Sequence, residues 1–219
     1  MLKRVICVLF GLTCLGFGIA LTMFSSLGSD PLATFINNLA FLGNVGYSVA
    51  YIFVNIILFL FMFIYLRNKI NIGTILALFV LGYITEMFSN LLGTIPFNVE
   101  ITSSIIFKII CVIIGITFNT FGLALYSESN IGLSPYDSFP LVLDKMIKSL
   151  NFTVAKILFD LLLVVLSIVL YVINKTIGHP YYLPTIITLI SIIIYGPMIS
   201  FFSLVINKTI FKGSKRVLK

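Results

Sequence analysis

The chain has 219 residues, of which 60% are hydrophobic and only 10% are charged, and its mean hydropathy is +1.17. This composition excludes a soluble globular domain, which would need far more polar surface, and predicts an integral membrane protein. The net charge is +7, but five of the fourteen basic residues lie in the last twelve positions, KTIFKGSKRVLK. A basic tail beside an apolar helix indicates a topology signal and contact with lipid headgroups, so we expect a bilayer and no nucleic acid as partner.

Six apolar runs are long enough to be membrane spans, because about 20 helical residues cross the roughly 30 Å of hydrocarbon. The first run is long for a signal peptide and no A-x-A cleavage site follows it, so we expect it to be retained. The six runs lie near residues 5–24, 47–66, 75–95, 106–126, 154–173 and 186–206.

Basic residues predict how these spans are oriented. If both termini are cytoplasmic, every lysine and arginine except Lys108 and Lys175 lies on the inner side. We therefore expect cytoplasmic N- and C-termini. We also expect a single membrane domain over residues 1–219, ending in a basic cytoplasmic tail at 207–219.

The sequence of the first half recurs in the second half. Residues 7–35 align without a gap on residues 111–139, and Gly, Pro, Phe and Ser recur in one register, which chance similarity among apolar helices does not explain. Each repeat, approximately 5–95 and 106–206, contains three spans. Because three is odd, the second copy enters the membrane from the opposite side, as in inverted-repeat transporters. The identical pairs include Gly11/Gly115, Gly18/Gly122, Ser25/Ser129, Gly28/Gly132, Pro31/Pro135 and Phe35/Phe139.

A short polar stretch after the first span of each repeat predicts the start of a short helix. Asp30 and Ser134 suit the N-cap, and Pro31 and Pro135 suit the first helical position. The apolar stripe behind each proline fits two placements. The helix either lies flat at the interface or climbs out of the membrane from a loop that dips into it.

In the second placement, we expect one binding site between the two helix starts. Free N–H groups there favour an anion or a carbonyl oxygen, whereas the two aspartates favour a zwitterion or a neutral polar solute. Gly28 and Gly132 would allow the sharp turn before each cap. The expected substrate-binding residues are Ser29, Asp30 and Thr34 on one wall, and Ser134, Asp137 and Ser138 on the other.

Polar residues inside the spans are expensive in hydrocarbon and form a second set of candidates. We expect Glu86, in the middle of the third span, to couple transport to protons or cations. Asp160 lies only a turn or two from the cytoplasmic end, so we expect it to be a hydrogen-bonded carboxylic acid between helices. Asn55, which aligns with Asp160, and Asn119 are their polar partners at similar depth.

Catalytic and metal-binding patterns are missing from the sequence. The three cysteines lie inside apolar runs, and His179 has no cysteine or second histidine near it. The chain also has no HExxH motif, no Cys–His or Ser–His arrangement near a bilayer surface and no ATP-binding loop. We therefore expect no metal site, no cofactor and no enzyme activity, and any pumping energy must come from an ion gradient or another chain.

Two copies of the pattern G-x-A-L…(L/I)-G-x-x-P, with NIGTI (71–75) leading into the third span, make the chain resemble the YitT/YczE/YyaS group of bacterial membrane proteins. The group's acidic residue two positions after the proline is present as Asp137, whereas the first copy has Ala33 there and carries Asp30 instead. The resemblance implies a bacterial plasma membrane protein, and members of this group are mostly of unknown function.

Taken with the residues themselves, these observations favour an all-α polytopic membrane protein that is a secondary transporter or permease for a small polar solute. Coupling to an ion or proton gradient would fit that role. The alternative is a non-transporting subunit or an accessory protein of a membrane assembly. The sequence leaves the solute and the oligomeric state open, including a homo-oligomer.

Overall fold

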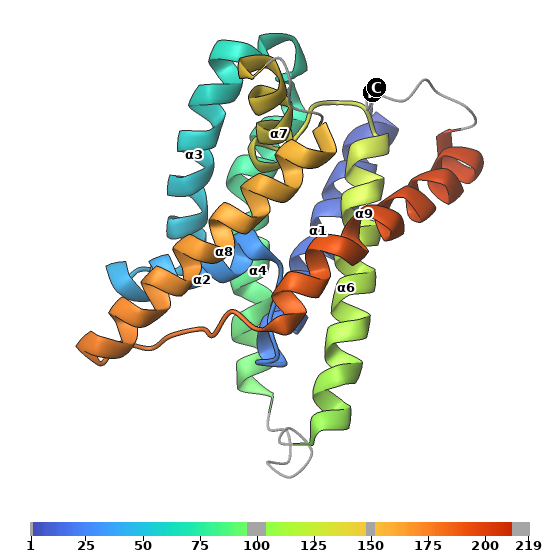
Figure 1. The fold of residues 1–219 in the computed structure, drawn as a ribbon. Helices are drawn as coiled ribbons and strands as arrows, with labels where there is room; N and C mark the ends of the chain where they lie inside the picture. The colour runs from blue at the N-terminus through green and yellow to red at the C-terminus, as the bar shows by residue number, and fades with distance from the viewer. Residues whose placement is uncertain (1, 96–103, 148–151, 212–219) are drawn as a thin grey trace.

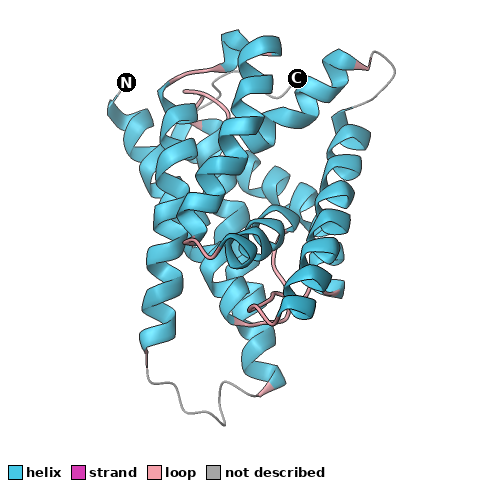
Figure 2. Cartoon of the chain, turned by 90° about the vertical axis from the view of Figure 1, so that its left-hand side faces the viewer, coloured by secondary structure: helices cyan, strands magenta, loops and turns pink. Residues whose placement is uncertain are grey.

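The computed structural model describes residues 2–95, 104–147 and 152–211, and these residues form eight α-helices (Figures 1 and 2). Six of the helices are long and apolar enough to cross a membrane, which confirms the six predicted spans. Most of the predicted basic tail, residues 212–219, lies outside the described residues. The spans are α1 (Leu2–Phe24), α3 (Tyr47–Tyr65), α4 (Ile72–Thr94), α6 (Ile105–Glu128), α8 (Phe152–Ile177) and α9 (Ile186–Ile206), the last continued by a π-helical turn over Asn207–Phe211.

Two short helices, α2 (Pro31–Gly43) and α7 (Pro135–Met146), begin where the sequence predicts them. The Asp30 carboxylate accepts from the Ala33 N–H at 3.0 Å, and the Ser134 hydroxyl accepts from the Asp137 N–H at 3.1 Å. These contacts satisfy a backbone donor that a helix start otherwise leaves unpaired. Before each cap the chain turns at a glycine with φ near +120°, a conformation that side chains rarely adopt.

The first spans of the two repeats, α1 and α6, cross closely and run antiparallel (Figure 1). A methyl group added to Gly18 would lie 2.4 Å from the Asn119 backbone nitrogen, and one added to Gly122 would lie 2.5 Å from the Gly11 carbonyl oxygen. Only glycine permits this backbone approach. Gly11 thus meets Gly122, and Gly18 meets Gly115, which is the reciprocal pairing that a two-fold axis between equivalent helices requires.

The two repeats also exchange their short helices. α2 of the first repeat packs mainly against α8 of the second, and α7 of the second packs mainly against α3 of the first. Each glycine turn fits against a capping box of the other repeat. Gly28 lies against Thr185 and Thr188 at the start of α9, and Gly132 lies against Thr74 at the start of α4. This exchange brings the starts of both short helices to the interior of the molecule.

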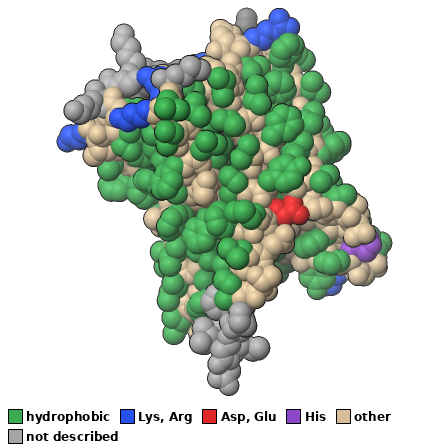
Figure 3. Space-filling model, turned by 180° about the vertical axis from the view of Figure 1, so that it is seen from behind, with side chains coloured by type: hydrophobic (Ala, Val, Ile, Leu, Met, Phe, Trp, Pro, Cys, Tyr) green, Lys and Arg blue, Asp and Glu red, His purple; other side chains and the backbone are tan. Residues whose placement is uncertain are grey.

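The surface of the molecule suits a bilayer. Figure 3 shows hydrophobic side chains over most of one face, with Lys and Arg side chains gathered mainly at one end. At that end the Lys3 ammonium donates to the Ile210 carbonyl oxygen at 3.1 Å, so the first turn of α1 and the last turn of the described chain lie side by side.

Site-directed labelling can test the inverted arrangement. Ser26 and Asn130 occupy equivalent exposed positions with φ of 56° and 57°, so a cysteine at either one is accessible. In a background with Cys7, Cys14 and Cys111 replaced by alanine, we expect Ser26→Cys and Asn130→Cys to react with an impermeant maleimide from opposite sides of the membrane. Labelling of both from the same side would contradict the inverted repeat.

Candidate functional site

A cavity of about 610 Å³ lies where the two repeats meet. All eight α-helices of the described chain line it, and the starts of both α2 and α7 reach it through Asp30 and Asp137. This geometry favours the placement in which the two short helices point their N-termini at a shared cavity, over flat interfacial helices. At one end the lining includes Phe152 and Thr153, exposed residues in the first turn of α8, so the cavity reaches the surface there.

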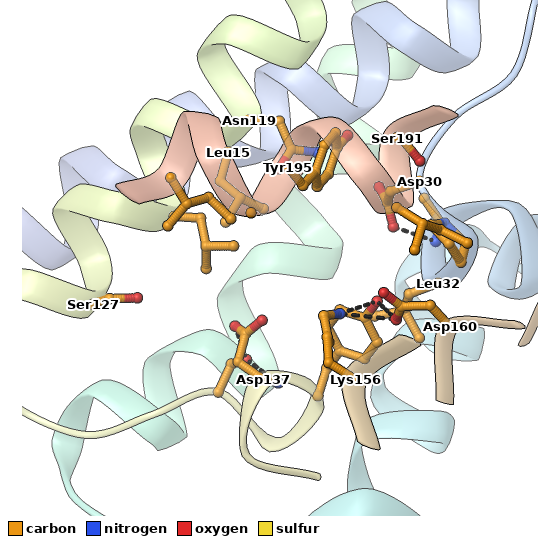
Figure 4. Close-up of a pocket in the computed structure, with 18 of the residues that line it drawn as sticks. Leu15, Asp30, Leu32, Asn119, Ser127, Asp137, Lys156, Asp160, Ser191 and Tyr195 are labelled. Carbon is orange, nitrogen blue, oxygen red and sulfur yellow. Dashed lines mark hydrogen bonds and ion pairs between the residues drawn. The ribbon is translucent and has the colours of Figure 1, made fainter. Parts of the chain in front are cut away.

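Three carboxyl groups and one ammonium group face this cavity (Figure 4). The Lys156 Nζ lies 2.8 Å from Asp160 Oδ1 and 2.8 Å from the Tyr136 hydroxyl oxygen. It also lies 4.0 Å from the centre of the Tyr136 ring, which is a cation–π contact. The Tyr136 hydroxyl donates to the same Asp160 oxygen at 2.6 Å. Lys156, Asp160 and Tyr136 therefore bond to one another, and Asp160 is a partner of Lys156 rather than an isolated carboxylic acid.

The other two carboxyl groups, from equivalent ends of α2 and α7, differ in their partners. Asp137 accepts a hydrogen bond from the Ser134 hydroxyl. Asp30 is only 7% exposed, its Oδ1 accepts from the Ala33 N–H, and its Oδ2 has no hydrogen-bond partner within the described parts of the chain. Burial raises the pKa of Asp30 to about 6 and outweighs the lowering by the Ala33 N–H and by Lys156. Burial likewise raises the pKa of Asp137.

Tyrosines supply much of the remaining polar lining. Tyr47 and Tyr51 stack on each other along α3, with ring centres 6.2 Å apart. Tyr195 of α9 accepts a hydrogen bond at 3.2 Å from the amide of Asn119 on α6. Sequence reasoning missed these tyrosines and Lys156. The sequence feature that could have identified them is a side chain with a polar end group within an apolar run, at positions where the two repeats meet.

Five of the ten polar candidates from the sequence line the cavity, and so does Pro31: the five are Asp30, Asn119, Ser134, Asp137 and Asp160. Three others, which were expected to line the cavity, form hydrogen bonds within the protein instead. The Ser29 hydroxyl bonds to that of Thr22 at 2.8 Å, while Thr34 and Ser138 donate to the carbonyl oxygens of Asp30 and Ser134 at 2.9 and 2.7 Å. A hydroxyl one turn into a helix readily makes this bond to the carbonyl four residues back.

Glu86 and Asn55 also lie outside the cavity lining. The Glu86 carboxylate accepts from the Ser48 N–H at 2.8 Å and so caps the start of α3, where Gly46 offers no side chain. The Asn55 amide donates to the Tyr51 carbonyl oxygen at 3.0 Å. Both residues therefore have structural contacts outside the cavity, and the ionisable groups at the cavity are others.

The two repeats differ in how their last spans pack. In α4, Gly82 lies against Tyr51 of α3, and an added methyl group would come within 2.9 Å of the ring. The equivalent glycine of α9, Gly196, lines the cavity and has nothing within 4 Å of an added methyl group among the described residues. Tyr51 aligns with Lys156, so the space beside Gly196 corresponds to a contact that the first repeat makes.

The far end of the short helices is also asymmetric. The Asn38 amide of α2 donates to the Ser167 hydroxyl at 3.0 Å and to the Tyr182 carbonyl oxygen at 2.8 Å, and its oxygen accepts from the Tyr182 N–H at 2.8 Å. The equivalent residue in α7, Val142, is instead buried in a cluster with Met62 and Leu66. At this position hydrogen bonds thus hold α2 against α8 and the segment before α9, whereas apolar contacts hold α7 against α3.

Comparison with known proteins adds a family and no function. The profile of a family of unknown function (DUF6198) matches residues 2–204 of the chain. Comparisons with curated proteins and with solved structures gave no match.

Proposed function

Because the chain belongs to the DUF6198 family, whose function is unknown, we propose a function from the site itself: a secondary transporter that moves a small polar solute by alternating access. The relation to YitT/YczE/YyaS proteins, and with it a bacterial plasma membrane, is part of the same proposal. The cavity between inverted repeats, with ionisable groups inside it, is the kind of site on which such transporters are built.

The observation that carries this proposal is the unequal packing of two equivalent helices. α4 closes on α3 through Gly82 and Tyr51, whereas α9 leaves a space beside Gly196. Because the two repeats share one sequence pattern, each can adopt the packing that the other shows here. A second state, in which the two repeats have swapped these packings, would then have a similar overall architecture. In that state α9 closes over α8 at the position of Lys156, and α4 opens beside Tyr51. The central site is then accessible from the other side.

In the described structure, the cavity opens toward the end of the molecule where α8 begins. The first turn of α1 lies at the same end. With the orientation that the basic residues predict, that end is cytoplasmic. The opposite end is closed by the hydrogen bonds of Asn38 to the segment before α9. We therefore assign the described chain to the inward-open state of the proposed transporter.

Asp30 supplies a buried carboxyl group inside the site, and its Oδ2 has no hydrogen-bond partner among the described residues, so it is suited to bind a proton. We assign the coupling role to Asp30 rather than to Glu86, which caps α3 outside the cavity. A proton gradient would then supply the energy for accumulation or extrusion of the solute.

Filling the space beside Gly196 tests alternating access. A leucine at this position has open space beside it in the present state among the described residues other than its chain neighbours, but it obstructs the closure of α9 on α8. In proteoliposomes containing a pH-sensitive dye, challenged with amines, amino acids and organic acids, we expect wild-type protein to give solute-dependent proton flux. Gly196→Leu should lose about nine-tenths or more of that flux and keep the wild-type thermal stability.

Gly93→Leu is the matched control, since a methyl group added to Gly93 of α4 also has no described residue within 4 Å, and Gly93 does not line the cavity. We expect this variant to transport like wild type. Unchanged flux in Gly196→Leu would contradict the proposed closure. Solute binding without flux in the wild-type protein would instead favour a non-transporting subunit.

A further inference from the structure

We infer that the solute is an organic cation whose ammonium group binds the free carboxylate oxygen of Asp30 and whose apolar body fills the cavity. The inference rests on the proposed function only in taking this cavity as the solute site. Four independent features of the cavity support it.

The first feature is the unpartnered oxygen itself. Asp30 is more than nine-tenths buried and lines the cavity, and its Oδ2 has no hydrogen-bond partner among the described residues. A buried acceptor without a donor destabilises the folded state, and a charged one does so more strongly. A ligand that brings an N–H donor into the cavity removes that destabilisation, so this oxygen selects for a donor.

The second feature is the balance of charge. Among the described residues, the cavity lining contains three carboxyl groups, those of Asp30, Asp137 and Asp160, and one ammonium group, that of Lys156, which is bonded to Asp160 and Tyr136. The helix starts offer little to an anion, because the caps already bind the Ala33 and Asp137 N–H groups, and Pro31 and Pro135 have no N–H. The site thus repels an anion and attracts a cation.

The third feature is a precedent within the same cavity. The chain's own ammonium group, on Lys156, is held by a carboxylate, a tyrosine hydroxyl and a tyrosine ring at 2.8, 2.8 and 4.0 Å. Asp30 offers the same carboxylate in a cavity that Tyr47 and Tyr195 also line (Figure 4). A carboxylate among aromatic rings is the combination that recognises ammonium groups.

The fourth feature distinguishes an organic cation from a metal ion. Among the described residues, no group of three or more His, Cys, Asp or Glu side chains lies close enough to hold a metal. The cavity, at about 610 Å³, has the size of a small-molecule site, and its walls are mainly apolar, with Leu12, Leu15 and Leu81 among them. A hydrated metal ion has no use for such walls, whereas the hydrocarbon part of an amine does.

A probe series that differs in charge and little in shape tests the inference. We propose isothermal titration of the purified protein in nanodiscs with 2-phenylethylammonium, 2-phenylethanol and phenylacetate, with empty nanodiscs as the blank. The cation should bind at least about tenfold more tightly than either of the others, because only it can form a charge-assisted bond to Asp30. No binding of the cation, or equal or tighter binding of phenylacetate or 2-phenylethanol, would overturn the inference.

Asp30→Asn locates the binding group. Asparagine is as good an N-cap as aspartate, so the start of α2 should be retained while the negative charge is lost. We expect about 10- to 100-fold weaker binding of 2-phenylethylammonium. Asp144→Asn, which removes a carboxylate of α7 outside the cavity lining, should bind like wild type. Unchanged binding in Asp30→Asn would refute the assignment.

If Asp30→Asn does not fold, Asp30→Ser repeats the test with another capping residue. The binding experiment is also separate from the transport experiment. Cation binding without flux would retain this inference and reject the transporter, whereas flux of a neutral or anionic solute without cation binding would do the reverse.

Discussion

Gly18→Leu and Gly122→Leu are expected to destabilise the protein by roughly 3 kcal/mol or more, the upper end of the cost of overpacking, and to lower the yield of folded protein. The reason is the backbone contact between α1 and α6. The first side-chain carbon alone would lie 2.4 Å from the Asn119 nitrogen in one variant and 2.5 Å from the Gly11 carbonyl oxygen in the other. Backbone cannot move aside as a flexible side chain can, so the two helices must separate.

This loss can be measured as the apparent unfolding temperature of the detergent-solubilised protein, together with its monodispersity on a sizing column. Gly18→Ala and Gly122→Ala should fall between wild type and the leucine variants, because alanine adds only the first carbon. Gly93→Leu, on the open side of α4, controls for the general effect of a larger residue in a helix. Wild-type stability in both leucine variants would show that the close antiparallel crossing is wrong.

The elements that could be predicted from the sequence are those with strong local signals. The spans follow from length and hydropathy, and the starts of α2 and α7 follow from a capping residue and a proline in adjacent positions. Comparison of the two repeats strengthened these predictions. Gly28 and Gly132 occupy equivalent positions, which predicted two equivalent turns. Both turns have φ near +120° in the structure.

The direction of individual side chains could not be predicted in the same way. Thr34 and Ser138 are chemically suited both to bind a solute and to bond to the carbonyl one turn back, and the structure shows the second. The functional prediction for Glu86 rested on its depth in the span. Its carboxylate caps the start of α3, and the contacted residue, Ser48, is 38 residues away in the chain. Such a long-range contact has no local signature.

Lys156 illustrates the opposite case. In the sequence it reads as a residue at the cytoplasmic end of a span, where lysine indicates topology. In the structure its ammonium group reaches inward to Asp160, one helical turn further along α8. The stem of a lysine is long enough to place its charge away from its backbone, so a residue that marks the membrane boundary can also be part of an interior site.

The ion pair of Lys156 and Asp160 leads to a second prediction with a large effect. Lys156→Met leaves the Asp160 carboxylate, whose side chain is 5% exposed, with the Tyr136 hydroxyl as its remaining donor. Removal of one partner of a buried pair typically costs 3–5 kcal/mol. We expect about 3 kcal/mol here, at the low end, because the Lys156 side chain is 31% exposed and solvent screens part of the interaction.

The reverse variant is expected to cost less. In Asp160→Asn the ammonium group loses its partner, but it can turn toward the open end of the cavity and keep its contact with Tyr136. The double variant Lys156→Met/Asp160→Asn leaves no unpaired charge, so it should be more stable than Lys156→Met alone. The order of unfolding temperatures should therefore be wild type, then Asp160→Asn, then the double variant, then Lys156→Met, with the last lower than wild type by about 6–12 °C.

A double-mutant cycle on these four proteins gives the coupling energy of the pair directly. Purely additive effects would mean that Lys156 and Asp160 do not interact in the folded protein, contrary to the 2.8 Å contact. The cycle also bears on the function. If the pair is intact in the stable state, Lys156 is not available to an anionic solute, and the site keeps the excess of carboxylates from which its preference for cations follows.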